Sequence, residues 1–427
     1  MKWLLLVAAF LLAGCISSGP GRESLDLIAR DYVKLQLAIG EKEEGYIDAY
    51  YGPPEWQAEA KTVAATPAAL TQRAAVLTVR LKSLPDSRLD PMEKRRRDFL
   101  LAQLKAASTR LAMMQGAKFA FADEAERLFG VRPELKPLSA YDPVLARIER
   151  LVPGKGALAD RVDAFHERFT IPKDRLEPVM RAAISECRRR TLEHIALPAK
   201  ERFTLEFVTG KSWGGYNWYK GDSNSLIQIN TDLPVRIGRA VDLGCHEGYP
   251  GHHVYNMLLE EKLARKRGWV EFTLYPLYSP QSFLAEGSAN YGKDLAFPGD
   301  ERLRFETATL YPLAGIPVGD AAAYSALQEA TQALAGARFT IARDYLEGRI
   351  DRARAVELTR KYQLVSKARA EQSIAFTDQY RSYVINYGLG QDMVRAAVER
   401  VGADPAARWR AMEKLLSEPT LPSDLEQ

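Results

Sequence analysis

Apolar residues recur at helical spacing through most of the first 200 residues. Between residues 25 and 51 the pattern predicts one helix, which stops at Gly52-Pro53-Pro54. Asp90 followed by Pro91 is typical of a capped helix start. The same periodicity, interrupted by Gly and Pro, predicts further helices over residues 67–84, 90–115, 122–128, 141–151, 157–169 and 174–195. This part of the chain therefore reads as an antiparallel helical array.

The pattern changes after Arg202. Residues 203–209 and 225–230 alternate apolar and polar side chains, which predicts two strands. The intervening residues 210–222 are rich in Gly, Trp and Tyr and are expected to form an aromatic loop. We therefore expect a small antiparallel sheet, followed by a helix that starts near Thr231 and continues into His246.

Helical patterns fill the remainder of the chain. They cover residues 254–266, 280–297, 299–313, 320–346, 353–362, 367–387 and 391–401. An aromatic loop containing proline is expected over residues 272–280. The predicted fold class is mainly α, a large helical array with a small antiparallel sheet before the helix that reaches His246. We expect an N-terminal helical region over residues 24–200 and a second region over 201–427, integrated as one domain.

The N-terminus has the features of a targeting segment. Lys2 precedes an apolar run over residues 3–13 that is of signal-peptide length and too short to span a bilayer as a stop-transfer helix. Leu12-Ala13-Gly14-Cys15 resembles the lipobox of bacterial lipoproteins. The resemblance implies cleavage before a lipidated Cys15 and a flexible tether over residues 16–23. Because Ile16 replaces the Asp that retains lipoproteins in the inner membrane, the expected location is the periplasmic face of the outer membrane.

Charge and cysteine content narrow the possible functions further. The formal net charge is only +4, one of which is lost with Lys2, so nucleic-acid binding is not expected. Beyond Cys15 only Cys187 and Cys245 remain. They could pair in an oxidising compartment, although two cysteines are no disulfide framework. Cys245 adjoins His246, but neighbours on a helix point about 100° apart, so we expect a buried, inert cysteine rather than a metal ligand.

The candidate chemistry lies between Cys245 and Tyr255. The chain has five histidines, and three of them, His246, His252 and His253, fall within eight residues. Glu247 follows the first histidine directly. Clustered imidazoles with an adjacent carboxylate suit a catalytic zinc and the general base that serves it. A second helix is needed to supply a carboxylate ligand, and Glu286, in an otherwise apolar helix start followed by Gly and Ser, is the best candidate.

The spacing of these histidines is irregular. The usual zincin motif places two histidines at i and i+4, but here position i+4 is Pro250. On an uninterrupted helix His252 would point elsewhere, and His253 would lie about 10.5 Å further along the axis. Pro250-Gly251 must therefore bend the helix. Deleting two residues restores the ordinary spacing with His252, so we favour it as the ligand, while His253 becomes a supporting or substrate contact.

Three other polar residues have open interpretations. Asp242, one turn before His246, either orients that imidazole or is an ordinary surface carboxylate. His166 and His194 lie within predicted helices, and we expect surface or core-edge positions for them rather than metal binding.

These residues resemble a known family. His246-Glu247-x-x-Pro250-Gly251-His252-His253 is similar to the His-Glu-x-x-Pro-Gly-His-His signature of the bacterial domain-of-unknown-function 885 family. Residues 285–291 resemble its Glu-Gly-Trp-Ala-x-Tyr segment, with Ser288 where Trp is usual. Residues 380–390 resemble its C-terminal Tyr/Gly block. The resemblance implies a zinc peptidase related to glutamate-zincin metallopeptidases, some of them carboxypeptidase-like, in a mostly helical shell.

Peptide hydrolysis also needs donors for the oxyanion and for a substrate carboxylate. The candidates are Tyr383, Tyr387 and Arg381, with Tyr219 from the aromatic loop behind them. Arg381 is chemically suited to hold a C-terminal carboxylate. The alternative is that the tyrosines belong to the core and that Arg381 is solvated.

The leading hypothesis is a lipid-anchored, zinc-dependent metallopeptidase that acts on peptides, with His246, His252 and Glu286 as ligands and Glu247 as general base. A second hypothesis is an envelope lipoprotein that binds peptides or scaffolds partners without catalysis. A third directs the same zinc and water at a cell-wall amide.

Overall fold

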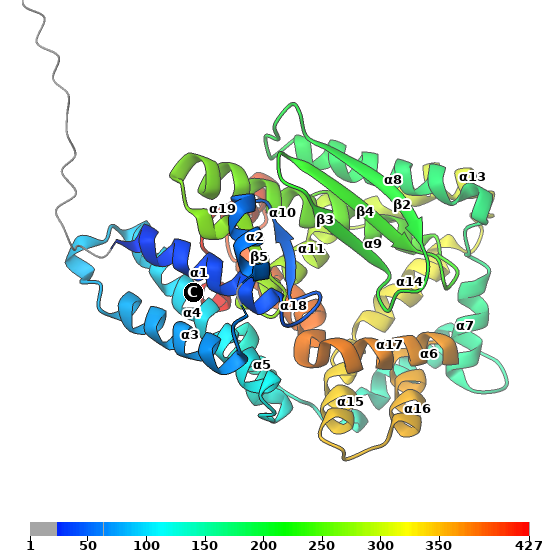
Figure 1. Ribbon diagram of the computed structural model, residues 1–427. Coiled ribbons are helices and arrows are strands. Elements are labelled where there is room, and N and C mark those ends of the chain that lie inside the picture. Colours follow the sequence, from blue (N-terminus) through cyan, green and yellow to red (C-terminus); the bar gives the residue numbers. More distant parts are fainter. Residues whose placement is uncertain (1–23, 63, 427) are drawn as a thin grey trace, which may run out of the picture.

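The computed structural model describes residues 24–62 and 64–426. The predicted signal peptide, the lipidated Cys15 and the tether lie outside these residues. The described chain is mainly α-helical, with two small sheets (Figure 1). None of its helices combines the length and the apolar character needed to cross a membrane.

Eight helices form the first part of the described chain. They are α1 Leu25–Gly40, α2 Pro54–Thr62, α3 Pro67–Lys82, α4 Pro91–Met114, α5 Phe121–Phe129, α6 Asp142–Leu151, α7 Leu158–Glu167 and α8 Leu176–Leu192. The predicted cap of α4 is confirmed, because the Asp90 carboxylate accepts the backbone amides of Met92 and Glu93 at 2.7 and 2.8 Å. The first predicted helix is too long, since α1 ends at Gly40 and the chain then enters a strand.

The predicted strands exist, but the expected antiparallel sheet is wrong. Strands β2 Arg202–Val208, β3 Gly215–Tyr219 and β4 Asn224–Asn230 form a mixed sheet in the order β2-β4-β3. β2 pairs parallel with β4, and β3 pairs antiparallel with it. The expected aromatic loop thus contains a strand. Left-handed backbone at Gly221, Asp222 and Ser223 reverses the chain between β3 and β4.

A second sheet was not predicted at all. β1 Ile47–Tyr50 pairs antiparallel with β5 Leu274–Pro276. The sequence pattern assigns the first of these segments to a helix and the second to a loop. Each strand is short and finds its partner more than 200 residues away, so local periodicity carries no signal for the pairing.

Helices return after the sheet. They are α9 Gly238–Leu243, α10 His252–Leu259, α11 Pro280–Ala296, α12 Glu301–Phe305, α13 Tyr311–Ala314, α14 Ala321–Gln332, α15 Ala337–Leu346, α16 Arg352–Gln363, α17 Lys367–Tyr380, α18 Ile385–Glu399 and α19 Pro405–Ser417. The predicted helix over 320–346 is two helices, since the chain turns at Gly336, where a Cβ would lie 2.4 Å from the Tyr141 hydroxyl. The helix predicted over 367–387 breaks at Arg381, which has a φ of 54°.

One principal hydrophobic core holds these elements together. It includes buried side chains from Leu25 to Leu425, and a second cluster is built mainly from α6, α7 and α14 to α17. In Figure 1, α1, α3, α4 and α5 lie on one side of the molecule, the three-stranded sheet lies on another, and α15 to α17 lie below it. The division near residue 200 stays a prediction.

Helices α11 and α18 approach each other closely at the centre of this core. A Cβ at Gly287 would lie 2.5 Å from the backbone of Gly390. The glycine after Glu286 thus allows the two helices to approach closely. The contact brings the start of α18, which contains Tyr387, against the helix that carries Glu286.

Candidate metal centre

The histidine motif lies on a broken helix. α9 runs into a π-helical turn over Gly244–Gly248, the Tyr249–Pro250 peptide is cis, and α10 begins at His252. The Gly251 amide donates to the Cys245 carbonyl at 3.0 Å. A Cβ at Gly251 would lie 1.8 Å from the His246 carbonyl oxygen, so only glycine fits there. The predicted interruption at Pro250-Gly251 is therefore present.

This bend brings together the three residues predicted as metal ligands. The Nε2 atoms of His246 and His252 lie 3.1 Å apart. Glu286, from α11, places Oε2 3.2 Å from His246 Nε2 and Oε1 3.7 Å from His252 Nε2. One ligand atom from each residue lies within 4.8 Å of the others. The sequence favoured His252 over His253, and the structure places His252 in this group.

These residues fit a zinc ion. Two nitrogen ligands about 2.1 Å from a tetrahedral ion lie roughly 3.4 Å apart, close to the spacing of the imidazoles. Glu286 Oε2 is buried and has no hydrogen-bond partner, although it faces His246. A metal ion between this oxygen and the imidazoles would satisfy it. Two imidazoles and one carboxylate form a three-residue set that leaves a fourth position open.

The electrostatics of the group point the same way. Burial disfavours the charged forms of both His252 and Glu286. Even so, the nearby carboxylates of Glu286, Glu247 and Asp48 raise the pKa of His252 to about 9. In turn, His252 and His246 hold the pKa of Glu286 below its ordinary value despite burial. The pocket therefore stabilises a positive charge between its carboxylates, which is the charge that a bound metal would supply.

Glu247 stands beside the cluster without belonging to it. Its Oε1 lies 4.0 Å from His246 Nε2, and its side chain is almost fully buried. Burial raises the pKa of this carboxyl, with the neighbouring imidazoles opposing the shift. A carboxylate with a raised pKa next to an open metal position is suited to accept and return a proton.

The position of Glu247 depends on a glycine in β3. A Cβ at Gly215 would lie 2.7 Å from Glu247 Oε1 and 2.8 Å from a Leu243 methyl group. Gly215→Ala should therefore displace the carboxylate and lower kcat/KM by on the order of 10²-fold while zinc stays bound. The matched control is Gly214→Ala, since a Cβ there would meet only an Arg239 nitrogen at 3.6 Å. Equal activity of the two variants would contradict this role of Gly215.

His253 supports the site from behind. Its Nδ1 lies 2.8 Å from the Ser225 hydroxyl, and its Nε2 lies 3.1 Å from Glu201 Oε2, so both nitrogens have partners. Burial opposes ionisation of Glu201, but hydrogen bonds from His253, Tyr249 and Arg188 lower its pKa to about 2. Sequence reasoning missed Glu201, which lies at the end of the helical region and has no motif around it.

The two predicted tyrosines both reach the site. The Tyr383 hydroxyl donates to Glu286 Oε1 at 2.8 Å and so orients that carboxylate. The ring of Tyr387 stacks on His246, with centroids 6.4 Å apart. Tyr387 also lines two cavities that border the metal cluster. Its hydroxyl has no hydrogen-bond partner among the described residues. Tyr387 is therefore the tyrosine with a donor left for a substrate.

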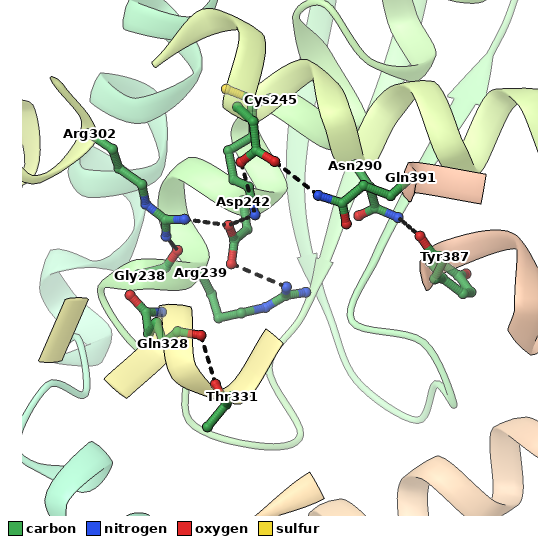
Figure 2. A network of polar contacts seen from close by, with 12 residues as sticks. Gly238, Arg239, Asp242, Cys245, Asn290, Arg302, Gln328, Thr331, Tyr387 and Gln391 are labelled. Atoms are coloured by element: carbon green, nitrogen blue, oxygen red, sulfur yellow. Dashed lines mark hydrogen bonds and ion pairs between the residues drawn. The ribbon is translucent and has the colours of Figure 1, made fainter. Parts of the chain in front are cut away.

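Three other predicted residues have different partners from those expected. The Arg381 guanidinium pairs with buried Glu124 at 2.8 Å, which corrects the proposed carboxylate clamp. The Tyr219 hydroxyl donates to Glu260, away from the metal cluster. Asp242 does not orient His246. Figure 2 shows it between the guanidiniums of Arg239 and Arg302, at 3.5 and 3.0 Å.

The two remaining histidines lie apart from the metal cluster. His166 Nδ1 lies 3.2 Å from an Arg236 nitrogen. The ring of His194 stacks on Trp409. Neither belongs to the group of possible metal ligands found in the described chain.

Sequence reasoning also missed Asp48. This residue of β1 lines a narrow hollow of about 50 Å³ beside His252, and it accepts a hydrogen bond from the Tyr216 hydroxyl of β3. Burial raises the pKa of Asp48 to about 6, although the bond from Tyr216 opposes the shift. The pairing of β1 with β5, and the bond from Tyr216, hold Asp48 at the site.

A disulfide ties the motif to α8. Cys187 and Cys245 are bonded, so Cys245 is buried as expected but is not a free thiol. The crosslink closes a loop of 58 residues. The Cys187→Ala, Cys245→Ala double variant should therefore lose about 4 kcal/mol of unfolding free energy, measured by urea denaturation. The wild-type protein under reducing conditions is the control and should show a similar loss. A difference below about 1 kcal/mol would contradict the prediction.

Among the comparisons with known proteins, only those with solved structures found similar chains. No protein-family model and no curated protein sequence matches this chain. The solved structure of a protein designated a lipoprotein from Colwellia psychrerythraea is similar, with a TM-score of 0.49 and 14% identity over 82% of this chain. The match covers 66% of that protein, just under two thirds of its length. An M32 carboxypeptidase from Deinococcus radiodurans R1 gives a TM-score of 0.44 and 13% identity, covering 94% of this chain and 92% of that one.

Proposed function

We propose that this chain is a zinc-dependent metallopeptidase of the cell envelope, as the motif resemblance to the domain-of-unknown-function 885 family implies. The observation that carries the proposal is the convergence of His246, His252 and Glu286, with one carboxylate oxygen left unpartnered, beside the buried Glu247. The cluster opens on a cleft of about 400 Å³, large enough for part of a peptide.

The chemistry divides among the residues around the cluster. When bound, zinc would polarise the scissile carbonyl and lower the pKa of water. Glu247 accepts the proton of the attacking water and returns it to the leaving amine. The free Tyr387 hydroxyl donates a hydrogen bond to the oxygen that becomes negative. Tyr383 and His253 hold the ligand-bearing segments in place.

The substrate backbone is expected to lie along β3. This strand pairs with β4 on one side only, and Gly215, Tyr216 and Asn217 line the site. An extended peptide can add to such an edge through main-chain hydrogen bonds. The scissile bond would then pass between Glu247 and Tyr387.

The proposal is tested by incubating the zinc-loaded protein with a peptide mixture and identifying the products by mass spectrometry. We expect cleavage that a chelator abolishes and added zinc restores. Peptides that bind without being cleaved would favour the peptide-binding lipoprotein instead. Cleavage restricted to cell-wall amides would assign the same site to the other substrate class.

The envelope location is part of the proposal and rests on the Leu12-Ala13-Gly14-Cys15 segment. Cys15→Ala is expected to move the protein from the membrane fraction to the soluble fraction of a Gram-negative host, because the lipid anchor is lost. Ile16→Asp is the matched variant and should shift it from outer to inner membrane. Membrane recovery unaffected by Cys15→Ala would refute lipid anchoring.

A further inference from the structure

The cleft beside the candidate metal centre is lined by an excess of cations. Arg239, Lys293, Arg338 and Arg369 line it, against two carboxylates, Asp242 and Glu247. A neighbouring hollow of about 450 Å³ shares all four cations and adds Arg236 and Arg302 to its walls. The positive lining therefore extends away from the metal centre.

Most of these cations already have carboxylate partners. Asp242 lies 3.5 Å from Arg239, 3.2 Å from Lys293 and 3.0 Å from Arg302. Arg302 also pairs with Glu306 at 2.8 Å, and Arg236 pairs with Asp163 and Glu167. Their charges are thus balanced within the protein.

Arg338 of α15 is different. No carboxylate of the described chain lies within ion-pairing distance of it, and its Nε is buried without a hydrogen-bond partner. Its guanidinium lies over the rings of Phe376 and Tyr387, at 5.1 and 5.8 Å. Burial lowers the pKa of Arg338. Because Tyr387 also stacks on His246, this arginine is one side chain away from the metal ligands.

Arg369 of α17 also lacks a counter-ion within the described residues. Its guanidinium donates a hydrogen bond to the Pro234 carbonyl, at 2.7 Å. Burial, with Arg236 and Arg239 nearby, lowers the pKa of Arg369 to about 10. Partly desolvated guanidiniums without carboxylates are costly to the fold, so two of them on one cleft indicate that the balancing anions come from the ligand.

We propose that Arg338 and Arg369 form a dianion subsite that selects peptides ending in Asp or Glu. One guanidinium receives the C-terminal carboxylate and the other receives the side-chain carboxylate of the same residue. A neutral C-terminal residue would leave one arginine without a partner. The inference rests on the proposed peptidase function and names the substrate class of that site. This subsite takes the role of carboxylate binding that the sequence predicted for Arg381, whose guanidinium is paired with Glu124.

Binding tests this subsite without requiring hydrolysis. The zinc-loaded Glu247→Gln protein is titrated by calorimetry with acetyl-Ala-Phe-Ala-Glu, the same peptide ending in Gln, and the Gln peptide as its C-terminal amide. A hydrogen-bonded charge pair contributes about 1.5–3 kcal/mol, so each lost carboxylate should weaken binding by about 10- to 100-fold. Equal affinities for the Glu and Gln peptides would overturn the proposal.

Variants then assign the preference to the two arginines. In the Glu247→Gln background, Arg338→Gln and Arg369→Gln should each reduce the Glu-over-Gln preference at least tenfold, with zinc content unchanged. Arg304→Gln is the matched control, because Arg304 is exposed and pairs with Asp300 at 2.8 Å. If Arg338→Gln does not fold, the Glu-over-Gln preference is measured in Arg338→Lys and Arg369→Gln instead. A preference retained in Arg369→Gln would exclude that residue and refute the two-arginine subsite.

The outcomes separate this inference from the peptidase proposal. Selective binding of the Glu peptide by a wild-type protein that cleaves no peptide would support the subsite and refute the peptidase. Cleavage of the Glu and Gln peptides at equal kcat/KM would support the peptidase and refute the subsite.

Discussion

Glu247→Gln is expected to keep its zinc and lose between about 10²- and 10⁴-fold in kcat, the range that a general base contributes. The amide has nearly the same shape, so it should fit the space that Gly215 leaves beside the carboxylate. It cannot accept the proton of the attacking water at neutral pH. Because Glu247 is not among the three clustered ligands, the metal should be retained.

The measurement is single-turnover peptide hydrolysis together with zinc analysis of the same preparation. Glu357→Gln serves as the matched control, since Glu357 is exposed and pairs with Arg354 on its own helix. Its activity should match the wild type. Activity of Glu247→Gln within a factor of about three of the wild type would rule out general-base catalysis by this residue.

Glu286→Gln and His252→Gln are expected to weaken zinc binding by at least about 100-fold, the upper end of the effect of losing a residue that merely supports a ligand. Glu286→Gln also removes the negative charge that faces both imidazoles. The protein should then be purified with much less than one zinc per chain, and activity should fall in proportion.

Two further variants sharpen this test. His194→Gln is the histidine control, because His194 stacks on Trp409 away from the cluster, and it should bind zinc normally. Tyr383→Phe removes only the hydrogen bond to Glu286 and should give an intermediate loss of zinc affinity, about tenfold. Zinc affinity unchanged in both Glu286→Gln and His252→Gln would rule out the metal centre described here.

Local patterns accounted for the parts of this protein that depend on neighbours in sequence. Helical periodicity located most helices, and the Asp90 cap was readable because its partners lie two and three residues away. The motif predicted a bend at Pro250-Gly251 because steric limits on proline and glycine act within a few residues. Glu286 stood out because a carboxylate is unusual in an apolar helix start.

Long-range contacts explain the errors. The sequence pattern predicts helix for β1, because nothing local signals a partner strand more than 200 residues away. It predicts a loop for β3, because the segment is rich in Gly, Trp and Tyr. Arg381 has suitable chemistry for a carboxylate clamp, but buried Glu124 lies within reach of it. Cys187 and Cys245 pair only because α8 packs against the motif turn.

The sequence by itself determined the mainly helical architecture, the bent motif and the set of residues available for a metal, because these depend on local periodicity, backbone sterics and side-chain chemistry. The tertiary structure decided that His252 rather than His253 faces His246 and Glu286, and that Gly215 makes room for Glu247. It also decided that Arg338 and Arg369 line the cleft with no counter-ion among the described residues. Those outcomes depend on contacts between segments that are distant in sequence, and such contacts leave no periodic pattern in a single sequence.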